Sequence, residues 1–182
     1  MRRLSYRINK RSCWYAYIAA ALLILYGFYQ YGSLEHLMII LKPVTFIVEK
    51  ALGISFAYIT DIGFVSEQVN VVINKNCSGV MFWMIVFLML GFSFIPRDHG
   101  SLKLFISFIS LLLFSYGITI AANASRIIIA INVLAFNEGQ TVAAGRLLHQ
   151  SIGILVYCTY LWMIYVIFLN LTKKEVDDEK AI

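Results

Sequence analysis

The chain has 182 residues, of which 60% are hydrophobic and 14% are charged. A soluble domain has about 45–50% apolar and about 25% charged residues, so this composition excludes an ordinary soluble domain and indicates an integral membrane protein. The net charge of +5 comes mostly from basic residues at the ends of apolar segments, where they orient membrane helices, and it predicts no nucleic-acid partner. Three cysteines without a close pair, and no cluster of metal-ligand residues, give no reason to expect a disulfide framework, a metal or another cofactor.

The first predicted element is an apolar segment behind a basic N-terminus. Residues 1–13 contain five Lys or Arg and no acid, and residues 14–31 are uncharged and about long enough to cross a bilayer. This apolar part is longer than the core of a usual signal peptide, and no A-x-A-like cleavage site follows it. We therefore expect an uncleaved first transmembrane helix over residues 14–31, with its basic end in the cytoplasm.

The next segment, residues 34–59, is apolar overall but does not have the pattern of a plain span. A charge at the bilayer centre costs about 2.5–3.5 kcal/mol on insertion scales. The segment carries Glu35, His36, Lys42, Pro43, Glu49 and Lys50. We expect an amphipathic or re-entrant segment on the outer surface, followed by a short extended stretch over residues 61–75, where apolar and polar residues alternate weakly.

Three further transmembrane helices are predicted, over residues 80–95, 104–124 and 152–171. With four spans both termini lie in the cytoplasm, and the Lys and Arg residues divide ten inside to five outside, as the positive-inside rule requires. The predicted fold class is thus an all-α polytopic membrane protein. It has about four transmembrane helices, the outer amphipathic or re-entrant segment and the short extended stretch, in a single domain over residues 1–182. If residues 34–59 also crossed the membrane, every later segment would have the opposite orientation in it.

This topology places Cys77, Arg126 and His149 at similar depth near the outer surface. Cys77 precedes the second span, at a helix N-terminus, where free amides and the helix dipole favour a thiolate. We expect Ser78 to be the N-cap and the amides of Ser78, Gly79 and Val80 to be able to bind an oxyanion. We also expect Gly79 to let a substrate backbone come close.

The neighbouring Asn76 makes the surroundings of Cys77 polar. The alternative is that Cys77 is a small buried hydrophobe, as most free cysteines are. Cys13 and Cys158 fit that alternative better, because no comparable polar cluster or helix start accompanies them.

The arginine and the histidine have local patterns of their own. Arg126 follows Asn123 by three residues and has alanines on both sides, which would let another helix approach the guanidinium. His149 lies between Gly145 and Gly153 at spacings of four, so the three share one helix face. The alternatives are an arginine that snorkels to headgroups and a polar histidine at the interface. Together, however, the three residue types suit acyl transfer: the cysteine attacks, the histidine moves the proton and the arginine stabilises the oxyanion.

At this point the chain resembles the exosortase/archaeosortase family of membrane transpeptidases, over about residues 34–160. Its order of Cys, Arg and His is the family's order, and the stretch Pro43–Glu49 and the strand-like approach to the cysteine are also similar. The matching stretches are Asn76-Cys77-Ser78-Gly79-Val80, Asn123-Ala124-Ser125-Arg126-Ile127 and His149-Gln150-Ser151-Ile152-Gly153. Many members have more spans than this chain, which resembles the short exosortase K-type branch.

The resemblance implies a multi-pass enzyme of the bacterial cytoplasmic membrane whose active site faces outside. Such an enzyme cleaves the C-terminal sorting signal of exported, membrane-anchored proteins and passes the acyl group to an acceptor. The signal consists of a short motif, a transmembrane helix and a basic tail. Two other classes stay open: a non-enzymatic membrane scaffold or transporter subunit, and a peptide-processing membrane cysteine protease of quorum-sensing type. The latter places its histidine before its cysteine, unlike this chain.

Overall fold

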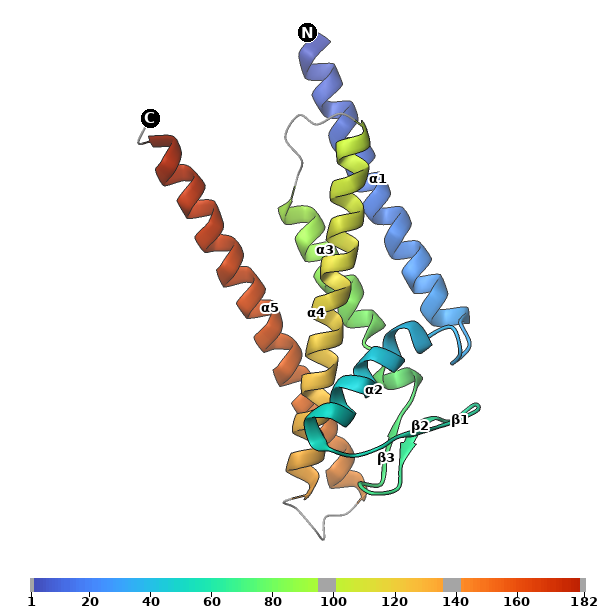
Figure 1. Ribbon diagram of the computed structural model, residues 1–182. Coiled ribbons are helices and arrows are strands. Elements are labelled where there is room, and N and C mark those ends of the chain that lie inside the picture. Colours follow the sequence, from blue (N-terminus) through green and yellow to red (C-terminus); the bar gives the residue numbers. More distant parts are fainter. Residues whose placement is uncertain (1, 95–100, 136–141, 181–182) are drawn as a thin grey trace. The chain divides into compact units, whose positions relative to one another are not determined.

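A computed structural model describes residues 2–94, 101–135 and 142–180, and it is mostly helical (Figure 1). The chain divides into two units, Met1–Ala124 and Ser125–Ile182. The elements are α1 (Arg2–Tyr31), α2 (Met38–Leu52), β1 (Ala57–Ile59), β2 (Gly63–Ser66), β3 (Val71–Ile73), the 3₁₀ turn η1 (Lys75–Cys77), α3 (Val80–Ser93), α4 (Ser101–Ala135) and α5 (Val142–Lys180).

Four segments of the described chain are long and apolar enough to cross a membrane. They are Ser12–Tyr31, Lys75–Ser93, Leu102–Leu134 and Leu147–Asn170. A bilayer core about 30 Å thick needs about 20 apolar residues in a helix, and these segments have 20, 19, 33 and 24. The four long apolar helices predicted from the sequence are therefore confirmed.

Helix α4 is longer than the predicted third span, because it continues through residue 124 to Ala135. Polar side chains in a helix interior compete for backbone hydrogen bonds unless they have partners elsewhere. Here Asn123 donates from Nδ2 to the backbone carbonyl of Cys77, and Ser125 Oγ lies 3.0 Å from the Tyr160 hydroxyl. The two polar residues at the predicted end of the span thus bond to other elements, and the helix continues.

The segment predicted as amphipathic contains one helix and one strand. Helix α2 has 15 residues and is about 22 Å long, so it is too short to cross a bilayer core. It buries Ile40, Leu41, Val44, Thr45 and Val48 and exposes Lys42 and Lys50 on its other side. It ends at Gly53, which has φ 67° and donates its amide to Glu49 O. This helix confirms an amphipathic element in the segment.

The predicted extended stretch is part of a three-stranded antiparallel sheet with the strand order β1-β2-β3. Phe64 pairs with Ile73, and Val65 pairs with both Ala57 and Val72. The prediction of an all-α fold is therefore wrong in this region, because residues 57–59 add a strand too short to show a pattern of its own. The sheet leads directly from β3 into η1 and α3 (Figure 1).

The core of the first unit joins α1 to α3. Trp14 is fully buried and donates from Nε1 to Gly91 O at 2.9 Å. A Cβ at Gly91 would lie 2.8 Å from Ile18 Cδ1, so the glycine allows the two helices to pack closely. Phe87 is also fully buried and lies edge-on to Phe108. This packing fixes the helix at whose start Cys77 lies.

Candidate functional site

Cys77 lies in a tight turn between β3 and α3. Asn74 accepts the amide of Asn76 on its side-chain oxygen at 3.1 Å, and its backbone carbonyl accepts the amide of Cys77 at 2.9 Å. The amide of Ser78 closes the turn by donating to Lys75 O at 3.1 Å. The turn is therefore fixed by its own hydrogen bonds. The cysteine side chain is 9% exposed, whereas Cys13 and Cys158 are exposed, so the expectation that these two fit a buried small hydrophobe better than Cys77 is wrong.

The prediction that Ser78 is the N-cap of the following helix is wrong. Helix α3 begins at Val80, and its N-cap is Gly79, which has φ 71° and no side-chain cap. Ser78 is instead the residue that caps the C-terminus of the η1 turn, and its amide already has an acceptor, Lys75 O. Of the three amides expected to bind an oxyanion, that of Ser78 is therefore occupied. Those of Gly79 and Val80 stay candidates, because a helix gives its first amides no partner of its own.

Asn123 of α4 reaches the cysteine turn within the first unit. It is fully buried, and its side-chain amide donates to the carbonyl of Cys77. A Cβ at Gly79 would lie 3.3 Å from Asn123 Cγ and 3.4 Å from Thr119 Cγ2. Gly79 is thus required both for its positive φ and for the approach of α4, a role that differs from the predicted approach of a substrate backbone. Asn123 was named in the sequence analysis because it lies three residues before Arg126, and that spacing did not indicate which group its side chain would bind.

Lys75 also holds this turn, and the sequence analysis missed it. Its Nζ lies 3.2 Å from Gly32 O and 3.4 Å from Gln30 O, and 5.4 Å from the centre of the Tyr29 ring. Carbonyls at a helix C-terminus lack partners in the helix and attract cations. Lys75 therefore ties the end of α1 to the turn that carries Cys77. In the sequence, only the position of Lys75 two residues before Cys77 could have suggested this contact.

Arg126 and His149 form a hydrogen-bonded pair in the second unit. Arg126 NH2 lies 2.9 Å from His149 Nε2, and NH1 donates to the Tyr157 hydroxyl at 3.1 Å. The guanidinium carbon is 5.5 Å from the centre of the Tyr157 ring. Gly153 makes room for this arrangement, because a Cβ there would lie 3.0 Å from Arg126 Nε. The helix face that carries His149 and Gly153 was predicted to have a close neighbour, and at Gly153 that neighbour is the side chain of Arg126.

The bond between arginine and histidine has a defined direction. A guanidinium stays protonated in proteins and can only donate, so His149 Nε2 accepts. A neutral imidazole that accepts at Nε2 carries its proton on Nδ1. While the bond lasts, the Nε2 lone pair is occupied and cannot take a proton from a thiol.

The charge of Arg126 has no acidic partner in the described side chains of the second unit. Residues 125–135 and 147–170 contain neither Asp nor Glu. The partners are a neutral imidazole and a phenol, and Arg126 Nε is buried without a hydrogen bond. A cation without a counter-ion in apolar surroundings is costly and marks a functional position by default. It would stabilise an anion that forms beside it.

Tyr157 is the residue of this cluster that the sequence analysis missed. His149, Gly153 and Tyr157 follow one another at spacings of four, so one face of α5 carries all three. The periodicity already used for the glycines could have found it.

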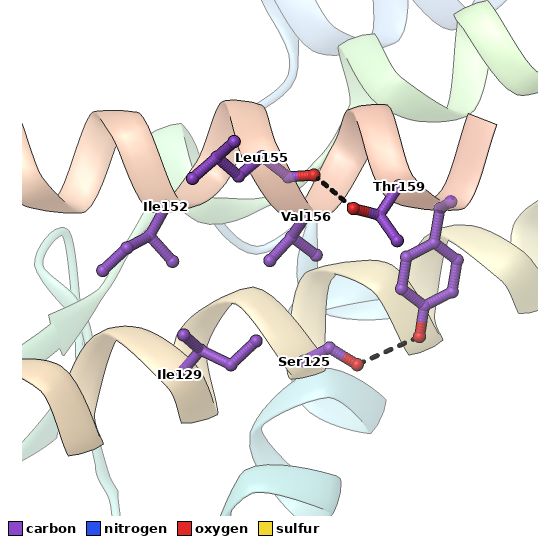
Figure 2. A pocket seen from close by; sticks show the side chains of 7 residues that line it. Ser125, Ile129, Ile152, Leu155, Val156 and Thr159 are labelled. Atoms are coloured by element: carbon purple, nitrogen blue, oxygen red, sulfur yellow. Dashed lines mark hydrogen bonds between the residues drawn. The ribbon is translucent and has the colours of Figure 1, made fainter. Parts of the chain in front are cut away.

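An apolar groove of about 380 Å³ also lies in the second unit (Figure 2). Its hydroxyl groups are hydrogen bonded: Ser125 Oγ to the Tyr160 hydroxyl, and Thr159 Oγ1 to Leu155 O at 2.8 Å. Ile129, Ile152 and Val156 complete its apolar walls. The groove therefore suits apolar side chains or acyl chains. Among the side chains that the structure describes, no three His, Cys, Asp or Glu residues gather as metal ligands.

Comparisons with known proteins add no relative: no family model matches the chain, and neither the curated proteins nor the solved structures contain a match.

Proposed function

We propose that the chain is a membrane-embedded cysteine transpeptidase or endopeptidase of exosortase type. Cys77 is the nucleophile, His149 moves the proton and Arg126 stabilises the oxyanion. The substrates are exported, membrane-anchored proteins with a C-terminal sorting signal. The enzyme lies in the bacterial cytoplasmic membrane with its site facing outside. The four long apolar helices support the membrane location.

The observation that carries the proposal is the hydrogen-bonded pair of Arg126 and His149. The two residues were selected in different segments for complementary roles, and they contact each other through atoms able to perform those roles. A scaffold would give no reason to place an uncompensated guanidinium on an imidazole.

The proposed reaction begins when the bond at His149 Nε2 opens and Nε2 takes the proton of the Cys77 thiol. The thiolate attacks the scissile carbonyl, and the negative charge that forms on the carbonyl oxygen is stabilised by Arg126. Protonated His149 beside Arg126 is a pair of like charges, which favours release of the proton. The proton passes to the leaving amine as the C–N bond breaks, and a thioester remains on Cys77.

In the second half of the reaction the thioester is broken by the same kinds of step in the opposite order. An acceptor nucleophile attacks the thioester, gives its proton to His149 and receives the acyl group, while Cys77 leaves as a thiolate that is then reprotonated. An amine or alcohol acceptor gives transpeptidation or transesterification, and water gives hydrolysis.

The test uses a reporter protein that ends in a recognition motif, an apolar helix and a basic tail, copied from secreted proteins encoded in the same genome. Cys77→Ala should abolish cleavage of the reporter and retain the wild-type thermal unfolding midpoint. The matched control is the double variant Cys13→Ala/Cys158→Ala, which should cleave at the wild-type rate. Cleavage by Cys77→Ala would overturn the assignment and favour the scaffold alternative.

A further inference from the structure

The two side-chain partners of Arg126 in the second unit serve it in different ways. His149 accepts one guanidinium N–H, but in the proposed reaction it also takes a proton at that same nitrogen. Once protonated, Nε2 can no longer accept, so the bond to Arg126 is lost in that step. Something else must then hold the guanidinium where the oxyanion forms.

Tyr157 has the contacts for this task. Its hydroxyl accepts from Arg126 NH1 at 3.1 Å, and its ring lies under the guanidinium, 5.5 Å from Cζ. A phenol oxygen keeps a lone pair that can accept a hydrogen bond whichever protonation state His149 has. The planar guanidinium can keep both the hydrogen bond and the stacking contact while its other edge changes partners.

We propose that Tyr157 is the positioning residue of Arg126, which keeps the guanidinium in place while His149 exchanges its hydrogen bond for a proton. The effect of Tyr157 on catalysis rests on the proposed function, whereas its positioning of the Arg126 side chain next to His149 does not. Tyr157 touches no reacting atom in this account and acts through Arg126.

The kinetic test compares Tyr157→Phe with Tyr160→Phe. Both variants lose one hydroxyl from α5 that bonds to a side chain of α4, but the Tyr160 hydroxyl bonds to Ser125 and not to Arg126. We expect kcat for the reporter to fall about tenfold in Tyr157→Phe, with KM unchanged, because a hydrogen bond to a charged group is lost. Tyr160→Phe should stay within about twofold of wild type.

A double-mutant cycle separates positioning from general packing. Lysine at position 126 has no planar fork to be held, so Tyr157→Phe should cost nothing further in the Arg126→Lys background. Equal losses in both backgrounds would overturn the proposal. So would equal kinetics for Tyr157→Phe and Tyr160→Phe in an enzyme that cleaves the reporter.

A spectroscopic test needs no substrate. In protein labelled with ¹⁵N-histidine, the His149 signals, assigned with His149→Gln, report which ring nitrogen carries the proton. Wild type and Tyr160→Phe should show the Nδ1-protonated tautomer, and Tyr157→Phe should show a loss of this tautomer as Arg126 becomes less fixed. An unchanged tautomer in Tyr157→Phe would overturn the positioning role. If that shift is seen but the wild-type protein leaves the reporter uncut, the proposed function fails and the positioning role stands.

Discussion

The turn around Cys77 and the cluster around Arg126 are held together by opposite means. The turn is fixed by backbone amides and carbonyls, the side-chain oxygen of Asn74 and the side-chain amide of Asn123. The cluster consists of three side chains, Arg126, His149 and Tyr157, and its guanidinium charge has no acid beside it among the described side chains of its unit. In the proposed reaction, bonds between neutral amides do not change when a proton is transferred, whereas the bond between Arg126 and His149 must open. On that proposal the first region fixes a position and the second carries the changes in charge.

The largest expected effect is on the charged cluster. Arg126→Gln should lower the rate of acyl-enzyme formation by about two to three decades, because an oxyanion donor contributes roughly 2.7–4 kcal/mol to catalysis. The same change should leave the thermal unfolding midpoint near that of wild type, because the charge that it removes has no counter-ion among the described side chains of its unit. A variant that unfolds before it loses activity would break the comparison, since the arginine would then be structural.

The opposite profile is expected for the cysteine turn. Asn123→Ala removes the donor to the Cys77 carbonyl in a fully buried position. It should destabilise the protein by about 1–3 kcal/mol, the cost of an unsatisfied buried polar group. Chemical denaturation in detergent measures this loss. If stability is unchanged while activity falls as far as in Arg126→Gln, then Asn123 acts in the chemistry and the division between the two regions is wrong.

A smaller loss is expected at Gly79. An alanine there must adopt φ 71° and bring its Cβ to 3.3 Å from Asn123, so Gly79→Ala should cost about 1–2 kcal/mol. Gly117→Ala is the control, because a Cβ added at that helical glycine would meet no heavy atom of another described element within 4 Å. Alanine there should stabilise the protein by about 0.5–1 kcal/mol. Equal unfolding midpoints for the two variants would contradict the role assigned to Gly79.

The smallest effect is expected at Lys75. Lys75→Met keeps an apolar side chain of similar length but loses the contacts to the two carbonyls at the end of α1. Because these contacts are long and partly exposed, the loss should be below about 1 kcal/mol. Lys50→Met on α2 is the control, since Lys50 is exposed and contacts the ring of Phe46. A loss that exceeds that of Asn123→Ala would mean that the lysine, and not α4, holds the turn.

Composition and long apolar runs were sufficient to predict the four long helices, because each apolar run is longer than those found in the helices of soluble proteins. The end of the third span expected at residue 124 was wrong because the polar side chains of Asn123 and Ser125 have partners on other elements, which sequence alone does not reveal. The sheet was only half predicted, since the strand Ala57–Ile59 is too short to show alternation.

At the candidate site, the predictions that depended on spacing succeeded best. The close packing predicted for the glycine face around His149 is confirmed at Gly153, where a Cβ would lie 3.0 Å from Arg126 Nε. The similar depth predicted for Arg126 and His149 agrees with the hydrogen bond between them. The N-cap at Ser78 failed because a 3₁₀ turn precedes α3 and moves the cap to Gly79. Such a turn depends on the hydrogen bonds of Asn74, whose preference for turns is known but whose partner is not readable from the sequence. Tyr157 was missed because an aromatic residue in an apolar helix usually belongs to the packing.

The most direct test of the account is to trap the acyl-enzyme. Wild-type protein mixed with the sorting-signal reporter and quenched in acid should gain the mass of the reporter's N-terminal part on the peptide that contains Cys77, and hydroxylamine should remove it. In His149→Ala the same adduct should form orders of magnitude more slowly, while the reporter still binds. A thioester that accumulates on Cys77 at the wild-type rate in His149→Ala would contradict the role of His149 in the first step, and an adduct on another cysteine would contradict the site itself.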